Sequence, residues 1–239
     1  SYFAMNQWQA AALQPDHLEA ICPWEGAADF YRDASYHGGI YTTWAERWYA
    51  RQVETVQHGV SENGYRSRMT GDWVAGPETL SELELDDNRA DLAEEWRTSY
   101  LITDEYWQSR NPDWSRVDVP MLSAGNWGGH GLHLRGNTEG YVQSASEQKW
   151  LEIHGGAHWT HFYTDYGRKL QKRFFDHFLK GEENGWEEKP SVHLQVRHPG
   201  EEYVQRHEDE WPIPRTDWTR YHLHANDLSL STTEPSSTA

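Results

Sequence analysis

Hydrophobic positions near the N-terminus repeat with the spacing of a helix. In residues 2–13, Phe3, Trp8, Ala11 and Ala12 can share one face, and Pro15 ends the pattern. The apolar run LEAICP at residues 18–23 then predicts a short buried strand that ends at a proline. The chain therefore opens with a helix and a strand, and a serine stands at the turn into the helix.

The pattern changes between residues 24 and 115. This stretch is rich in Trp, Tyr and acidic residues, and YTTWAERWYARQV and RADLAEEWRTSYLITDEYW have helical spacing. It has almost no strand signal, so we predict a helical insertion. Trp44, Trp48 and Tyr49 can form its core or face a substrate, and both interpretations stay open. Gly38 and Gly39 in YHGGIY mark a turn that is either a plain loop or the mouth of a lid.

Buried strands return after the insertion. Residues 121–125 and 150–153 are apolar, and both runs lead into glycines. YGRKLQKRFFDHFLKG predicts an amphipathic helix that ends at Gly181, with Leu170, Phe174, Phe178 and Leu179 on one side. Strands separated by helices predict an α/β fold with a parallel sheet, whose functional residues follow the carboxyl ends of the strands.

The C-terminal part has the alternation of half-buried antiparallel strands. SVHLQVR and TRYHLH alternate, and the Pro-broken segment HEDEWPIPRTDW lies between them. We predict a core in two parts, residues 1–24 and 116–186, a helical cap at 25–115, and at 187–239 the start of a β-sandwich domain that the chain does not complete. We therefore expect an interior fragment of a longer protein.

Composition narrows the class of protein. The chain has 239 residues, of which 36% are hydrophobic, and its fourteen tryptophans and thirteen tyrosines can bury much apolar area. Thirty-eight acidic against twenty-one basic residues give a formal charge of −17, which disfavours nucleic acid and anionic membranes as partners. No apolar run reaches the roughly 18 residues of a membrane span. The single cysteine, Cys22, excludes an internal disulfide.

Serine chemistry is indicated by two segments far apart in the sequence. Ser1 directly before a helix suits the nucleophile elbow of an α/β-hydrolase, where the next backbone N–H, that of Tyr2, serves the oxyanion hole. The first half of the G-x-S-x-G pattern, and a second oxyanion donor, would precede residue 1. His158 lies in IHGGAHWTHF, a Gly-rich loop after a strand, where the base of this fold stands.

Further motifs resemble the cocaine esterase and X-prolyl dipeptidyl-peptidase family of acyl hydrolases. The shared segments are Ser1-Tyr2, QWQAA at residues 7–11, GGAH up to His158, LQKRFFDHFLKG and DEWPIPRTDWTRYHL, although GGAH lacks the family's Pro-Trp. The resemblance implies an α/β-hydrolase core followed by a jelly-roll domain, with Ser1 as nucleophile, Tyr2 N–H as oxyanion donor and His158 as base. It implies no cofactor.

One position departs from this family. Its acid is usually an Asp after the strand that follows the cap, and in AGNWGGHG the aligned residue is Gly129. We hypothesise that the acid has moved to Glu25, at the carboxyl end of the preceding strand, because a His without a carboxylate partner is a poorer base. Asp29 is the second choice, with a structural role as its alternative. The alternative for Glu25 is a solvated loop carboxylate.

Two other functions compete with the serine hydrolase. His154, His158 and His161, with His130 and His133 nearby, could hold a zinc ion, although no H-E-x-x-H pattern occurs. A Trp-rich chain could also be a non-catalytic binding module for carbohydrate or apolar ligands. For the hydrolase, the substrate is a small ester or amide. Ester, acyl amide and X-Pro peptide stay open, and esterase is favoured because the cap offers no clear carboxylate pair for a free amino terminus. The oligomeric state is left open.

Overall fold

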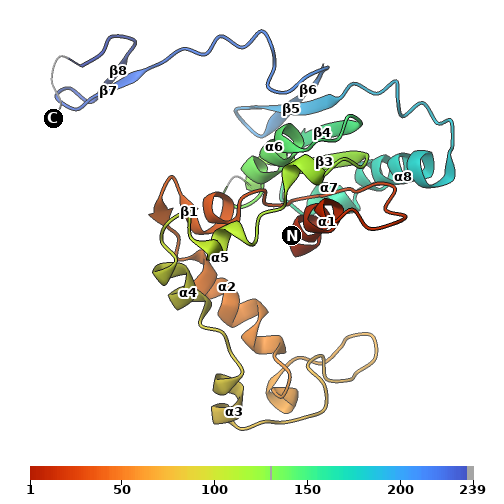
Figure 1. The fold of residues 1–239 in the computed structure, drawn as a ribbon, viewed down its shortest axis with the longest axis vertical. Helices are drawn as coiled ribbons and strands as arrows, with labels where there is room; N and C mark the ends of the chain where they lie inside the picture. The colour runs from red at the N-terminus through yellow and green to blue at the C-terminus, as the bar shows by residue number, and fades with distance from the viewer. Residues whose placement is uncertain (130, 236–239) are drawn as a thin grey trace.

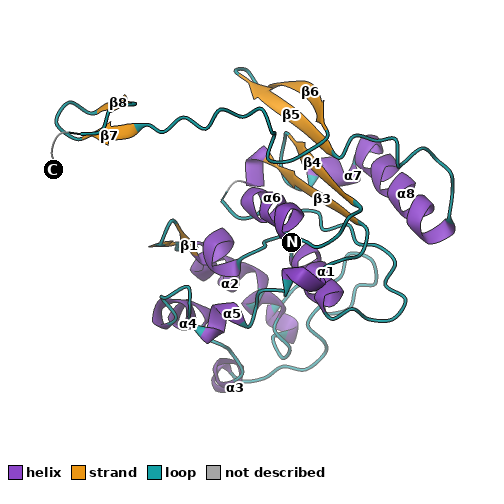
Figure 2. Cartoon of the chain, turned by 45° about the horizontal axis from the view of Figure 1, so that its top comes forward, coloured by secondary structure: helices purple, strands orange, loops and turns teal. Residues whose placement is uncertain are grey.

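A four-stranded sheet forms the centre of the computed structural model, which describes residues 1–129 and 131–235. Its strands are β3 (Met121–Asn126), β4 (Lys149–His154), β5 (Val192–His198) and β6 (Glu202–Glu208), hydrogen-bonded in that order. The pairs β3–β4 and β4–β5 are parallel, and β5–β6 is antiparallel. Helices α1 (Tyr2–Ala12) and α6 (Leu134–Gln143) lie on one face and α8 (Asp165–Lys180) on the other (Figure 2). The predicted α/β arrangement is therefore present.

The predicted strand at 18–23 lies beside β3 as an extended segment with two isolated parallel bridges. Ile21 pairs with Met121 and Trp24 with Ala124. The backbone N–H of Ile21 donates to Pro120, and that of Glu25 donates to Ala124. Pro23 has no N–H to donate, which interrupts the ladder. The segment nevertheless delivers Glu25 to the carboxyl end of the sheet.

Helix α1 confirms the predicted helix at 2–13, with one correction to its buried face. Trp8, Ala11 and Ala12 are buried as expected, but Phe3 is 80% exposed and Ala4 is buried in its place. The Trp8 ring fills the space between α1 and α6, and its Nε1 donates to the sulfur of Met121 at 3.0 Å. This contact fixes α1, and with it residue 1, against the sheet.

Helix α8 confirms the predicted amphipathic helix on the other face of the sheet. Leu170 and Phe174 are buried in a cluster with Trp24, Trp150 and other residues of the sheet, and Phe178 packs against it. Leu179 was expected on this face but is 56% exposed, because it lies at the edge of the apolar stripe in the last turn. Gly181 ends the helix in the left-handed conformation at φ 67°.

The insertion is helical, as predicted, and extends away from the sheet (Figure 1). Its aromatic core contains Tyr36, Trp96 and Trp107 with Trp44 packed against them, so Trp44 belongs to the core of the cap. Gly38 and Gly39 both have positive φ and form the turn of a small hairpin. The regular elements of the cap are a π-helical turn (Tyr31–Ser35), β1 (Tyr36–His37), β2 (Ile40–Tyr41), α2 (Trp44–Gln52), α3 (Glu82–Asp87), α4 (Leu92–Thr98) and α5 (Glu105–Gln108).

The C-terminal strands are arranged differently from the simple prediction. SVHLQVR forms β5, which pairs with β4 and with β6, a strand that the sequence analysis did not assign. TRYHLH contributes β7 (His222–His224), which pairs with β8 (Ser229–Ser231) in a separate hairpin on an extended arm (Figure 1). A β-sandwich beyond residue 187 stays a prediction. Within the described residues, no helix is long and apolar enough to cross a membrane.

Many of the tryptophans are part of the interior. Within the described residues the buried ones are Trp8, Trp24, Trp96, Trp107, Trp150 and Trp186. They belong to the clusters on both faces of the sheet and in the cap. The aromatic content therefore serves packing in a chain with few aliphatic residues, which removes the main reason to interpret the chain as a carbohydrate-binding surface.

Candidate active site

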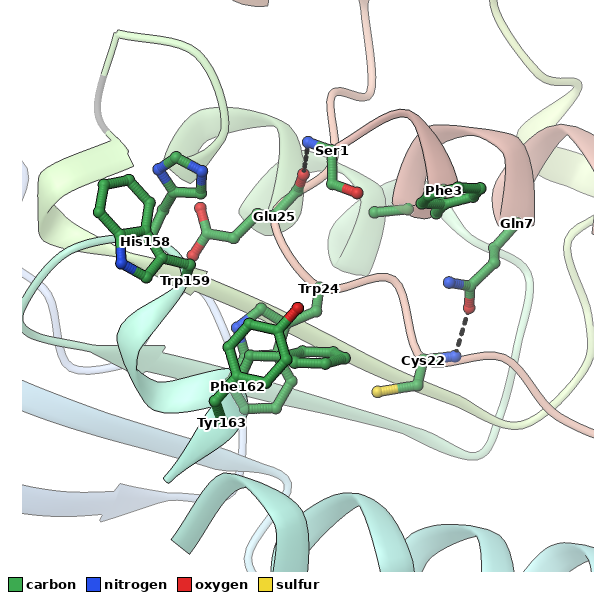
Figure 3. Close-up of a pocket in the computed structure, with 11 residues that line it drawn as sticks. Ser1, Phe3, Gln7, Cys22, Trp24, Glu25, His158, Trp159, Phe162 and Tyr163 are labelled. Carbon is green, nitrogen blue, oxygen red and sulfur yellow. Dashed lines mark hydrogen bonds between the residues drawn. The ribbon is translucent and has the colours of Figure 1, made fainter. Parts of the chain in front are cut away.

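Ser1, Glu25 and His158 line one cavity of about 310 Å³ (Figure 3). Ser1 precedes α1, Glu25 follows the extended segment beside β3, and His158 lies in the loop between β4 and the short helix α7 (Thr160–Tyr163). The three residues proposed from sequence for the catalytic roles thus meet in space. The rest of the lining is largely aromatic and consists of Phe3, Ala4, Gln7, Cys22, Trp24, Trp159, Phe162 and Tyr163.

Ser1 is the N-cap residue of α1, and its hydroxyl group does not cap the helix. Its carbonyl accepts the backbone N–H groups of Ala4 and Met5, while its side chain makes no cap hydrogen bond. The Tyr2 N–H belongs to the first turn, where amides have no partner within the helix and the helix dipole is positive. A developing oxyanion beside Ser1 would meet this amide.

His158 faces the cavity from a glycine-rich turn. Gly156 in this turn has φ 81°, a conformation that favours glycine. The His158 ring packs against Trp159, with centroids 4.7 Å apart, and against His133 at 5.6 Å. Burial lowers the pKa of His158. The ring is therefore neutral near pH 7, the state in which it can accept a proton.

The hydroxyl of Ser1 and the His158 ring make no direct hydrogen bond, although both are described and line the same cavity. Catalytic hydrogen bonds are often long in a protein without substrate and shorten in the complex. The two residues thus share a cavity, and their catalytic roles stay a prediction.

Glu25 is the least solvent-exposed of the three residues and has an unusual backbone. It is 2% exposed and has φ 63°, a left-handed conformation that costs about 1–2 kcal/mol for a residue with a side chain. Its Oε1 accepts a hydrogen bond from Asn126 Nδ2 at 2.8 Å, whereas Oε2 is buried and has no hydrogen-bond partner among the described residues. Burial raises the pKa of Glu25 to about 8, against the opposing effect of the hydrogen bond from Asn126. The carboxyl group points toward the His158 ring (Figure 3).

Gly129, the position aligned with the family acid, adjoins this carboxyl group. A Cβ atom at residue 129 would lie 2.8 Å from Glu25 Oε2. The Gly129 N–H donates to Asn126 Oδ1 at 2.7 Å. The Glu25 carboxyl group thus occupies the space that a side chain at 129 would need, so the alternative of a solvated loop carboxylate does not describe it.

The neighbouring aspartates have structural partners. Asp29, the second choice for the acid, accepts the backbone N–H of Arg32 at 3.1 Å and pairs with its guanidinium at 2.5 Å, outside the cavity lining. Asp33, which the sequence analysis did not single out, is 3% exposed and accepts the amides of Ala28 and Asp29. It also pairs with Arg135 of α6 at 2.7 Å, which fixes the start of the cap to the core.

The histidines are dispersed around the carboxyl group. His154 is fully buried, its Nε2 lies 3.9 Å from Glu25 Oε1, and within the part of the chain that the structure describes neither ring nitrogen has a hydrogen-bond partner. Burial lowers the pKa of His154 to about 3. His161 packs on it with centroids 4.5 Å apart, and His130 lies outside the described residues. No three His, Cys, Asp or Glu side chains among residues 1–129 and 131–235 form a group that could hold a metal ion.

One residue of the site, Asn126, was not identified from sequence, and a second, His133, was considered there only as part of a possible zinc site. Asn126 ends β3, is fully buried and touches both Glu25 and Gly129. His133 lies 3.1 Å from the Ser1 nitrogen, and its Nδ1 lies 3.1 Å from the carbonyl oxygen of Gly26. The sequence feature that could have identified Asn126 is its position, because it is a polar residue at the carboxyl end of an apolar strand.

Known proteins resemble this chain in sequence and in fold. The family model for X-Pro dipeptidyl-peptidase (S15 family) matches residues 1–163. Two crystal structures of a CocE/NonD family hydrolase from Staphylococcus aureus are similar, each with a TM-score of 0.76 and 32% sequence identity. The match covers 99% of this chain and 38% of the hydrolase chain, so the chain spans less than half the length of that relative. No curated protein matches the chain. These similarities confirm the resemblance and the α/β-hydrolase fold that it implies.

Proposed function

Because the chain belongs to the X-Pro dipeptidyl-peptidase (S15) family, we propose that the protein is a serine hydrolase that cleaves ester or acyl-amide bonds through an acyl-enzyme. The observation that supports this most is the shared cavity of Ser1, Glu25 and His158. These residues arrive from three separate parts of the fold. Their chain order of nucleophile, acid and base on this fold is the usual Ser…Asp/Glu…His order.

The proposed reaction assigns one role to each group. The Ser1 hydroxyl attacks the substrate carbonyl while neutral His158 accepts its proton. The Tyr2 amide donates to the oxyanion that forms. Because burial raises the pKa of Glu25 to about 8, Glu25 is ionised above about that pH, and in this form it stabilises the imidazolium, which then protonates the leaving group. Water, deprotonated by His158, releases the acid product and restores Ser1.

The lining of the cavity favours an ester over an X-Pro peptide. A dipeptidyl-peptidase has to bind a free, positively charged amino terminus, which requires an exposed negative group. Among the described residues, Glu25 bears the only carboxyl group in this lining, and it is buried and hydrogen-bonded to Asn126. Asp29 and Asp33 are paired with arginines. A neutral ester with an apolar acyl group suits the aromatic walls better.

The test uses the full-length protein that contains this chain. A fluorophosphonate probe should label it, peptide mass spectrometry should place the label on Ser1, and Ser1→Ala should abolish both labelling and hydrolysis of a p-nitrophenyl ester. A chelator should leave the hydrolysis unchanged. An unlabelled protein, or a label on another serine, would show that the proposed chemistry is wrong.

A further inference from the structure

We propose that Asn126 is a positioning residue, which holds the Glu25 carboxyl group and the Gly129 backbone in one fixed arrangement. The proposal rests on the proposed function, because it concerns the acid of that catalytic site. No role has so far been assigned to Asn126. The proposal also explains how Glu25, on the segment beside β3, can take the position of an acid that in this family usually lies on the loop after β3.

The contacts of Asn126 fix the orientation of its amide. The Gly129 N–H can only donate, so the Asn126 atom that it meets at 2.7 Å is the acceptor Oδ1. Nδ2 then faces Glu25 Oε1 at 2.8 Å and donates to it. Asn126 is fully buried, so water does not compete for either bond. The amide therefore connects the two positions where this site can carry an acid.

This connection leaves one carboxyl oxygen available for catalysis. Oε1 of Glu25 is occupied by Asn126, whereas the buried Oε2 has no hydrogen-bond partner among residues 1–129 and 131–235. Rotation of the carboxyl group would break the hydrogen bond to Asn126 inside a low-dielectric interior, which is costly. Oε2 is thus kept free to accept the N–H of a protonated His158, which the carboxyl group faces (Figure 3).

Asn126 also supports the ionised form of Glu25. The hydrogen bond from Asn126 lowers the pKa of Glu25, against the larger opposing effect of burial. Two titratable side chains also face this carboxyl group, since His154 Nε2 lies 3.9 Å from Oε1 and His158 lines the same cavity. Loss of the Asn126 donor should therefore move the ionisation of Glu25 to higher pH.

The experiment compares Asn126→Asp with wild type in the full-length enzyme. Asp keeps an acceptor for the Gly129 N–H but replaces the donor with a second carboxylate oxygen. We expect kcat for a p-nitrophenyl ester to fall about tenfold to a hundredfold with KM nearly unchanged, the cost of one hydrogen bond to a charged group. In the dependence of kcat/KM on pH, the acidic limb, where kcat/KM falls as the pH is lowered, should move to higher pH. Asn126→Ala should move it in the same direction without adding a charge.

A second buried asparagine provides the matched control. Asn137 of α6 is also fully buried, and it accepts the Gly26 N–H at 2.9 Å and donates to Pro23 at 2.9 Å, without touching a carboxylate. Asn137→Asp should lower Tm but leave the acidic limb at its wild-type pH. If Asn126→Asp does not fold, Asn126→Ser takes its place in the same comparison.

A double-mutant cycle decides the mechanism. With Glu25→Gln in place, Asn126→Asp should cause little further loss of kcat, since the group that it positions is gone. Two results would overturn the role of Asn126. One is an acidic limb at the wild-type pH in every folded Asn126 variant, and the other is a double variant whose loss of kcat equals the combined losses of Glu25→Gln and Asn126→Asp. Absence of Ser1 labelling in the wild-type protein would overturn the proposed function instead, so the two failures are distinguishable.

Discussion

Glu25 Oε2 lies 2.8 Å from the point where a Cβ atom of residue 129 would stand. The two residues follow neighbouring parallel segments, since Trp24 pairs with Ala124. Both can therefore present a group to the same point above the sheet, but the space holds only one side chain. In this chain Glu25 fills it and residue 129 is a glycine.

Replacement of Glu25 by Gln should strongly reduce catalysis. We expect kcat to fall by about 10³ to 10⁴, as for triad acids in other serine hydrolases, because the imidazolium loses its negative partner. Steady-state hydrolysis of a p-nitrophenyl ester by the full-length enzyme measures this. Asp29→Asn is the control, and its effect should stay within about threefold because Asp29 pairs with the half-exposed Arg32. Unimpaired turnover of Glu25→Gln would mean that the acid lies elsewhere.

The acid should be transferable from residue 25 to residue 129. The double variant Glu25→Gly/Gly129→Asp removes the colliding side chain, and glycine suits the φ of 63° at residue 25. We expect it to recover at least about tenfold of the kcat/KM that Glu25→Gly loses. Gly129→Asp alone should be less stable than the double variant, because its Cβ meets the carboxyl group of Glu25. Thermal unfolding and ester hydrolysis check the pair, and an inactive but folded double variant would contradict the shared position.

Stability should fall as pH rises through the ionisation of Glu25. The pKa of Glu25 is raised from 4.5 to about 8, so between these values the folded state holds a proton that the unfolded state has released. The free energy of unfolding therefore decreases with pH in this window and is unaffected by Glu25 below it. Urea unfolding at pH 5, 6.5 and 8 measures the slope. Glu25→Gln should have a flatter slope, and an identical one would refute this ionisation.

His154 should make the free energy of unfolding decrease as the pH falls below 6.5, which is the opposite dependence on pH from that of Glu25. The pKa of His154 is lowered from 6.5 to about 3 by burial, so its contribution is present above pH 6.5 and is lost as pH falls toward 3. His154→Gln should therefore lose less stability than the wild type between pH 6.5 and 4. Equal losses in urea unfolding would show that His154 is not buried in its neutral form.

The packing of Trp8 should make Gly140 intolerant of a side chain. A Cβ atom at residue 140 would lie 2.7 Å from the Trp8 ring, within the contact between α1 and α6. We expect Gly140→Ala to lower the free energy of unfolding by about 1–3 kcal/mol through overpacking. Gly131→Ala is the control, because no atom lies within 4 Å of its added Cβ. Equal Tm values for the two variants would contradict the predicted overpacking.

The main helices and strands of the core could be predicted from the sequence. The periodicity of residues 2–13 and of YGRKLQKRFFDHFLKG predicted α1 and α8, and the apolar runs predicted β3 and β4. Local patterns suffice there, because each element must bury one apolar face or be apolar throughout. The residues at the edge of each helix's apolar face were predicted less well. Phe3 and Leu179 are exposed, because burial at that edge depends on which other elements pack against the helix.

Sequence alone determined that Ser1 precedes a helix and that His158 and an acidic residue follow strands of an α/β fold. Only the tertiary structure decided that Glu25 is buried beside Gly129, that Asn126 holds it, and that the β5–β6 hairpin extends the central sheet. Asn126 and Glu25 are separated by 101 positions. A contact over that separation depends on how the segment beside β3 registers against β3, and no local pattern of residues contains that information.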